Sequence, residues 1–196
     1  MRLGEIIETS TLGFVAKSEE LHAHPPLGSL VKVRGPDGAD YAYAVVSFGR
    51  TTTPEPGRRA VARGGGNVHD EAVYREHPQL PHILQTEFHA VLVGCAEGGQ
   101  MRQYFPPQPP RLHYDVLECS ADEARAFSER LPYFRLLLTA LGEISGEQLL
   151  AAHIRAVYRQ RGDDITWLER AARETAALLK GDYERLMTVL HGIDPA

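Results

Sequence analysis

The sequence LGEIIET at residues 3–9 is followed at short intervals by GFV (13–15), PPLGSLVKV (25–33) and YAYAVV (41–46). Apolar, β-branched and aromatic residues dominate these segments, and turn-forming residues separate them, which is typical of consecutive β-strands. Four such strands in close succession predict the opening of a small β-barrel. We place the strands at residues 3–8, 12–17, 30–33 and 40–48.

Strand patterns return after residue 86. The apolar run AVLV lies within residues 87–95, and a Glu-Gly-Gly turn then leads into a strand at 101–105. The proline-rich run at 106–110 favours a stiff extended backbone, so we interpret it as a strut. It precedes a last strand at 113–119, which we expect to complete the barrel.

The stretch between these two strand regions, residues 49–86, lacks the strand pattern. It contains TTTPEPG (51–57) and GGG (64–66), both of which favour loops. We expect two short helices within it, one at 70–76 with Asp70 as its N-cap and one at 81–85. The stretch is therefore interpreted as an insertion between two barrel strands.

The pattern becomes helical from residue 120. Ser120 and Glu123 have the spacing of a capping box, and Ser145 opens a second box of the same kind. The run Gly162-Asp163-Asp164 is expected to end the helix that follows Ser145 and cap the next, whose apolar face continues past Gly181 with a bend. Short connections predict three or four helices packed as antiparallel neighbours.

These patterns predict an α+β protein. A small closed β-barrel is expected over residues 1–119, with the insertion at about 49–86, and a helical subdomain over residues 120–196. The composition supports a folded globular chain, because 43% of the 196 residues are hydrophobic and 24% are charged.

Charge and cysteine content restrict the function further. The formal net charge of -5 disfavours a surface devoted mainly to duplex nucleic acid. No apolar run approaches the ~20 residues of a membrane span, and the first residues lack a signal-peptide pattern, so we expect a cytoplasmic protein. The two cysteines, Cys95 and Cys119, are expected to be free thiols packed at strand ends.

The opening segments, in this order and spacing, resemble the HAS-barrel family. That family's barrel stands at the N-terminus of HerA-type hexameric ATPases and of the ATP synthase α and β subunits. The resemblance rests on GEII (4–7), the strand with Phe14-Val15, PPLGSLVKV (25–33) and AVV (44–46), and AVLVG (90–94) fits its second half. The helices after residue 119 are similar to those of short, stand-alone members of cyanobacterial type.

The chain departs from the larger members in one respect. It has no Gly-x-x-x-x-Gly-Lys-Ser/Thr motif, and its glycine cluster at 64–66 is followed by Asn67-Val68-His69, with no lysine to reach a phosphate. The resemblance therefore implies an assembly or docking role without ATP hydrolysis. The partners that it implies are another protein, including a ring ATPase, or a second copy of the chain.

Some residues suggest catalytic or metal-binding sites, but each of these patterns has a simpler interpretation. His22 and His24 beside Glu19 and Glu20 suggest metal ligands, but alternate residues on an exposed loop point apart, so we favour a surface loop. Pairing of a cysteine with His89 or His113 carries no triad signature by itself, and no hydrolase motif is present. We therefore predict no catalytic residue, no metal and no cofactor.

The most basic stretch is the only candidate contact for a ligand. Arg50, Arg58, Arg59 and Arg63 lie among glycines that let the backbone approach a polyanion. The simpler interpretation is a solvated loop, because no aromatic residues are interleaved for base stacking. The sequence thus predicts a non-catalytic protein-interaction module, with a nucleic-acid-associated accessory factor using the 50–63 loop as the alternative.

The sequence predicts that two further residues of the helical region are buried. His153 falls on the apolar stripe of its helix, where a hydrogen-bonded buried histidine is expected. Trp167 stands at the start of the last predicted helix and is expected to be a core anchor.

Overall fold

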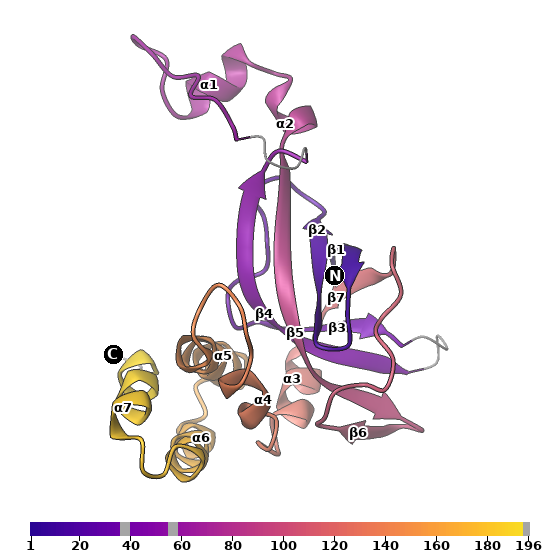
Figure 1. Cartoon of the computed structure of the whole chain (residues 1–196), viewed down its shortest axis with the longest axis vertical. Coiled ribbons are helices and arrows are strands. Elements are labelled where there is room, and N and C mark those ends of the chain that lie inside the picture. The colour runs from indigo at the N-terminus through magenta and orange to yellow at the C-terminus, as the bar shows by residue number, and fades with distance from the viewer. Residues whose placement is uncertain (36–39, 55–58, 194–196) are drawn as a thin grey trace.

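The computed structural model describes residues 1–35, 40–54 and 59–193. It consists of a β-barrel, a group of helices packed on one side of it, and an arm that projects away from both (Figure 1). The strands are β1 Arg2–Thr9, β2 Gly13–Ser18, β3 Leu30–Arg34, β4 Tyr41–Thr52, β5 Gln85–Glu97, β6 Gln100–Arg102 and β7 Asp115–Glu118. The helices are α1 Glu71–Glu76, α2 Leu80–Ile83, α3 Ala121–Phe127, α4 Phe134–Leu138, α5 Gly146–Gln160, α6 Ile165–Leu178 and α7 Tyr183–Gly192.

Six antiparallel strands close the barrel. The sheet order is β2-β1-β7-β3-β4-β5, and β5 also pairs with β2. Each of these six strands therefore pairs with two neighbours, which closes the barrel. The short β6 pairs with β5 alone and lies outside the barrel. The predicted N-terminal barrel with a helical part is therefore confirmed, including a last strand that completes it.

Small and branched side chains fill the barrel interior. Ala16, Ala42, Ala44 and Ala90 leave room for the larger Phe88, which is fully buried among them. Alternation along the strands places these residues inside, because successive side chains point to opposite faces.

A second core lies between the barrel wall and the helices. The outward residues Tyr43, Val45 and Val93 of β4 and β5 pack against aromatic and aliphatic side chains of α3, α4 and α5. Both faces of these two strands are therefore buried over residues 42–46 and 92–95, which explains why these two stretches contain no charged side chain.

The predicted helix starts are confirmed where a side chain caps them. Ser120 and Glu123 make both bonds of the capping box that opens α3. Ser145 accepts from the backbone of Gln148 at the start of α5, and Asp164 accepts from Trp167 at the start of α6.

Two helix predictions were wrong. The chain does not continue as a helix through Gly181, because Gly181 adopts a φ of 95° and Asp182 caps a separate helix, α7. The described residues after 120 therefore form five helices rather than three or four. Asp70 has a φ of 50° and makes no side-chain cap to α1, although the helix itself is present.

The strands around the insertion run further than predicted. β4 continues to Thr52 and β5 begins at Gln85. We call the chain between them, residues 53–84, the arm; the structure describes its residues 53–54 and 59–84. It carries α1 and α2 and projects from the end of the long β4–β5 hairpin, at the opposite end of the molecule from the helices α5 to α7 (Figure 1). Among the described residues, no helix combines the length and the apolar character needed to cross a bilayer.

Candidate functional site

The base of the arm is fixed by one histidine from the loop between β2 and β3. The backbone amide of His22 donates to the Thr86 hydroxyl at 2.7 Å, and its imidazole bonds to the hydroxyls of Thr51 at 3.2 Å and Tyr74 at 2.7 Å. Thr51 and Thr86 bond to each other at 2.8 Å across β4 and β5. His22 thus connects three elements of the fold, and its φ of 66° places it in the left-handed region.

The neighbouring His24 packs against the same hairpin. A Cβ at Gly49 would lie 2.6 Å from two atoms of the His24 imidazole, so the glycine allows the ring to approach the strand closely. Both histidines are exposed on a surface loop, as predicted, and both contact the hairpin. Glu19 bonds to Arg2, and in residues 1–35, 40–54 and 59–193 no three His, Cys, Asp or Glu side chains gather as a metal site.

We predict that loss of the Tyr74 hydroxyl or of the His22 imidazole loosens the arm without unfolding the barrel. Tyr74→Phe removes one hydrogen bond, worth roughly 1 kcal/mol, and His22→Asn, chosen because asparagine tolerates positive φ, removes that bond and the one to Thr51. Amide hydrogen exchange in α1 and α2 should accelerate about fivefold in Tyr74→Phe and at least as much in His22→Asn, while exchange in α5 stays unchanged. Tyr183→Phe is the control, because Tyr183 is 73% exposed on α7; equal arm exchange in all three variants would contradict the prediction.

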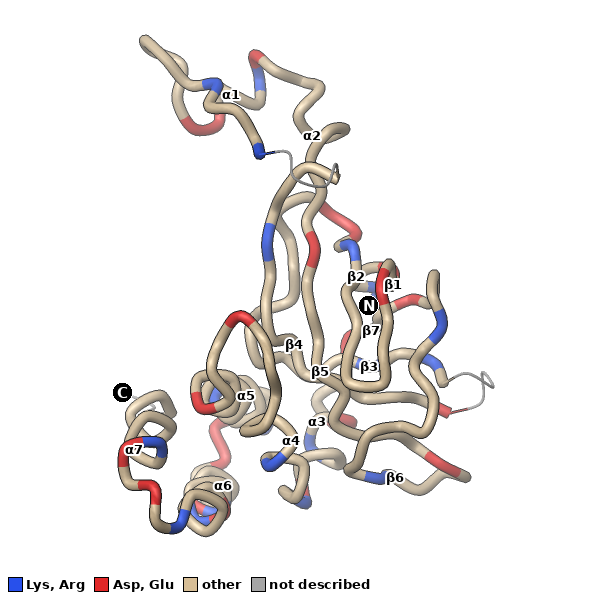
Figure 2. The backbone as a smooth tube through the Cα atoms, in the orientation of Figure 1, with Lys and Arg blue, Asp and Glu red and all other residues tan. Residues whose placement is uncertain are grey.

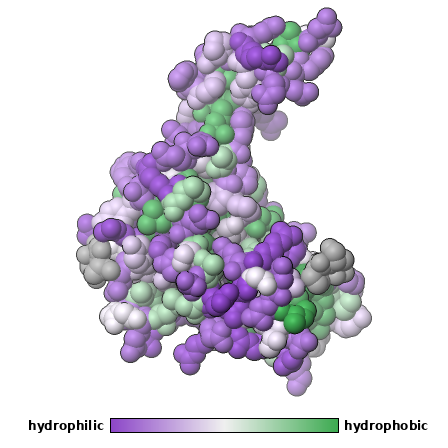
Figure 3. All heavy atoms as spheres, turned by 180° about the vertical axis from the view of Figure 1, so that it is seen from behind, coloured by the Kyte–Doolittle hydropathy of each residue, from purple (hydrophilic) through white to green (hydrophobic). Residues whose placement is uncertain are grey.

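The arm contains an open cavity of about 450 Å³. Its walls come from α1, α2 and the segment before them, and they are mainly apolar. Val61 is 76% exposed and Ile83 41% exposed at its rim, and apolar residues are visible where the arm joins the barrel (Figure 3). The lining residues are Thr53, Pro54, Arg59, Ala60, Val61, Arg63, Val73, Tyr74, Leu80, His82, Ile83 and Leu84.

The four arginines predicted as a polyanion contact have different surroundings. Arg50 lies on β4 and pairs with the buried Glu87 of β5, with 2.9 Å between the guanidinium and the carboxylate. Arg59 and Arg63 are exposed and border the arm cavity. Figure 2 shows both basic and acidic positions along the backbone of the arm. Arg58 lies outside the described residues. The structure therefore brings Arg59 and Arg63 to one cavity and places Arg50 in the hairpin below it.

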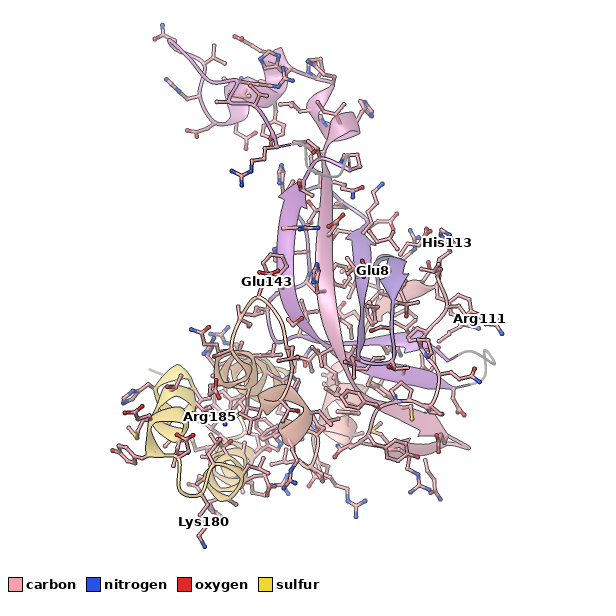
Figure 4. All side chains as sticks on the ribbon, viewed as in Figure 1. Glu8, Arg111, His113, Glu143, Lys180 and Arg185 are labelled. Carbon is pink, nitrogen blue, oxygen red and sulfur yellow. The ribbon has the colours of Figure 1, made fainter. Side chains whose placement is uncertain are left out.

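A second hollow, which we call the junction groove, lies between the barrel and the loop that joins α4 to α5. It has a volume of about 310 Å³ and is walled by the β1–β2 hairpin, the outer faces of β4 and β5, and residues 139–143. Leu12 and Leu141 border it and are 59% and 95% exposed. Glu8 and Glu143 also border it and lie on either side of β5 in the view of Figure 4.

His89 of β5 faces the junction groove. Its Nε2 is buried and has no hydrogen-bond partner, and its ring meets Phe48 edge-on at 5.1 Å between centroids. Burial, assisted by the nearby Arg50 charge, lowers the pKa of His89, while Glu87, Glu143 and Glu8 act in the opposite direction. The sequence suggested His89 only as a partner for a cysteine. Strand alternation could have placed its side chain on the outer face of the barrel, because it lies between Phe88 and Ala90, which face the interior.

The cysteines are free and buried, as predicted. Burial raises the pKa of the Cys95 thiol to about 11 and that of the Cys119 thiol to about 12, with nearby carboxylates adding to the effect. A thiol of this kind is mostly protonated at neutral pH and is a poor nucleophile. The Cys95 thiol contacts Glu97, and the His113 imidazole bonds to Glu5 at 2.7 Å. Cys95 and His113 therefore do not form a thiol–imidazole pair.

His153 and Trp167 occupy the interior, as predicted. The Nδ1 of His153 donates to the Gly28 carbonyl at 2.7 Å, and its Nε2 accepts from the Tyr133 hydroxyl at 2.9 Å. Complete burial lowers the pKa of His153 to about 4, so the imidazole is neutral. The Trp167 indole donates to the Ser128 carbonyl at 2.8 Å, which anchors α6 to the end of α3.

Comparison with known proteins adds no relative. No protein-family model matches the chain, and a search of curated proteins finds no match either. The candidate surfaces of the protein are thus an arm fixed at its base, a cavity within that arm, and a groove between barrel and helices.

Proposed function

We propose that this protein is a non-catalytic interaction module that docks onto other protein surfaces through its arm. The observation that carries the proposal is the arm itself, residues 53–84, which projects from the barrel and exposes Val61 and Ile83 around an open cavity. Exposed apolar side chains beside arginines are the composition of protein-binding surfaces.

The way in which the arm is held supports a docking role. A segment fixed by His22 at its base loses less conformational freedom on binding than a free loop would, so more of the contact energy appears as affinity. The resemblance of the opening sequence segments to those of HAS barrels, whose role in larger proteins is assembly, points in the same direction.

The test uses a variant that lacks the arm. Thr52 and Gln85 are paired across the antiparallel hairpin, so an Asn-Gly turn can replace residues 53–84. Full-length and arm-less proteins are each tagged, cross-linked mildly in a lysate of the source organism treated with nuclease, and the captured proteins are identified by mass spectrometry. We expect a specific set of proteins that the full-length chain captures and the arm-less chain does not.

The arm-less variant must first be shown to fold. Its barrel core lies away from the arm, so its unfolding midpoint should stay close to that of the full chain. If it folds and captures the same proteins as the full-length chain, the arm is not the docking element. If neither protein captures anything beyond background, the docking proposal is rejected unless the chain binds its own copies.

A second candidate function is polyanion binding by the arm. It is favoured by Arg59 and Arg63, whose exposed guanidinium groups have no ion-pair partner among the described residues. Binding to labelled single-stranded nucleic acid should then weaken steeply with salt and be lost in Arg59→Ala/Arg63→Ala. Replacement of the exposed Arg34 and Arg111 by alanine, which removes the same charge outside the arm, should leave it unchanged.

A further inference from the structure

We infer that the partner of the junction groove is the arm of a second copy of this chain, with the segment 59–63 seated between Glu8 and Glu143. This inference rests on the proposed docking function and specifies its partner. It joins two surfaces of the same molecule that are both exposed and carry opposite charge.

The junction groove has the chemistry of a site for a basic and apolar segment. Leu141 is 95% exposed and Leu12 59% exposed, which is unusual for large side chains that line a hollow. Glu8 and Glu143 are also exposed, and within the described part of the chain neither carboxylate makes a hydrogen bond or an ion pair. By contrast, Glu87 beside the groove is already neutralised by Arg50.

The unpartnered nitrogen of His89 adds a polar position inside this groove. Its Nε2 is shielded from water yet bonds to nothing, which costs free energy unless a ligand supplies a partner. A backbone amide or a guanidinium entering between the two glutamates would supply a donor to this neutral imidazole.

The arm carries a segment of complementary composition. Residues 59–63 read Arg-Ala-Val-Ala-Arg, all five are exposed, and no helix or strand includes them. In an extended backbone alternate side chains share a face, so Arg59, Val61 and Arg63 would point the same way, with the arginines about 13 Å apart. An apolar residue between two cations matches an apolar groove between two anions.

Within one copy, the arm does not reach the junction groove. The arm projects from the far end of the β4–β5 hairpin, whereas the junction groove lies on the barrel wall beside the α4–α5 loop (Figures 1 and 4). An arm-to-groove contact between copies is head-to-tail, so each copy offers one arm and one groove. Such a contact builds chains or closed rings rather than only dimers.

The experiment measures mass in solution by sedimentation velocity, from low concentration up to about 1 mM. We expect the wild type to form species heavier than the 21.7 kDa chain, and to lose them as salt is raised. Arg59→Ala/Arg63→Ala and Glu8→Gln/Glu143→Gln should each remain monomeric. Control variants with matched charge changes outside the arm and the groove, Arg34→Ala/Arg111→Ala and Glu20→Gln/Glu184→Gln, should associate like the wild type.

Mixing the two defective variants provides the sharpest test. Glu8→Gln/Glu143→Gln keeps an intact arm, and Arg59→Ala/Arg63→Ala keeps an intact groove. One molecule of each can therefore form a single arm-to-groove contact, and no further molecule can be added to the pair. The mixture should give a 1:1 complex of twice the chain mass, although each variant alone is monomeric. Circular dichroism and unfolding midpoints confirm that both variants are folded.

Three results would overturn the inference: a wild type that is monomeric throughout, association that persists in either double variant, or a mixture that stays monomeric. These results are separable from failure of the proposed function. Suppose that the wild type is monomeric, but the full-length chain captures proteins that the arm-less chain does not. The docking function then stands, and only the choice of a second copy as the partner is rejected.

Discussion

Gly28→Ala is expected to destabilise the protein by at least about 3 kcal/mol. Gly28 has a φ of 85° and sits where the barrel meets α5; an added Cβ would lie 2.4 Å from the Ala152 carbonyl carbon and 2.5 Å from the His153 nitrogen. These are backbone atoms in the middle of a helix, so they cannot move aside, and the substitution combines dihedral strain with overpacking.

Urea denaturation followed by circular dichroism measures this loss. Gly162→Ala is the matched control, because Gly162 has a similar φ of 75° but nothing within 4 Å of its added Cβ. It should cost only about 1 kcal/mol, the cost of the dihedral alone. Equal losses in the two variants would show that the contact between Gly28 and α5 is unimportant.

The second large effect is a loss of stability in acid that depends on His153. The pKa of this imidazole falls from 6.5 to about 4 on folding. Between these values the unfolded chain binds a proton that the folded chain does not, so stability is complete above pH 6.5 and falls as the pH decreases toward 4. The loss should reach about 3 kcal/mol, from about 1.4 kcal/mol per pKa unit.

The measurement compares the free energy of unfolding of the wild type and His153→Gln at several values between pH 7 and pH 4. Glutamine does not titrate, so the variant starts less stable but loses less as the pH falls, and the two curves should converge. The other eight histidines of the chain contribute equally to both proteins and cancel. Parallel curves would contradict the prediction.

Much of the fold could be predicted because its signals are local. Alternation in the opening strands, the capping box at Ser120 and the cap at Asp164 each depend on residues within a few positions of one another, and all are confirmed. Gly181 misled the helix prediction because the apolar spacing continues across it, whereas its positive φ ends the helix.

The remaining features depend on contacts between distant residues. Thr51 and Thr52 look like a loop in sequence, yet their backbones stay paired with Thr86 and Gln85. The bond from His22 to Tyr74 and the meeting of Glu8 with Glu143 at one groove join residues that no spacing rule connects. Single-sequence patterns therefore predicted the basic stretch within residues 50–63 but not the acidic groove.

The position of β7 also has a consequence for how the chain folds. This strand lies between β1 and β3, pairing Arg2 with Leu117 and Val31 with Glu118. During synthesis the first three strands must wait, with unpaired edges, until residue 118 has left the ribosome. A topology with such long-range pairs has a high contact order and folds slowly, and its exposed edges make the nascent chain prone to aggregation. We therefore expect the barrel to close only after β7 has been synthesised.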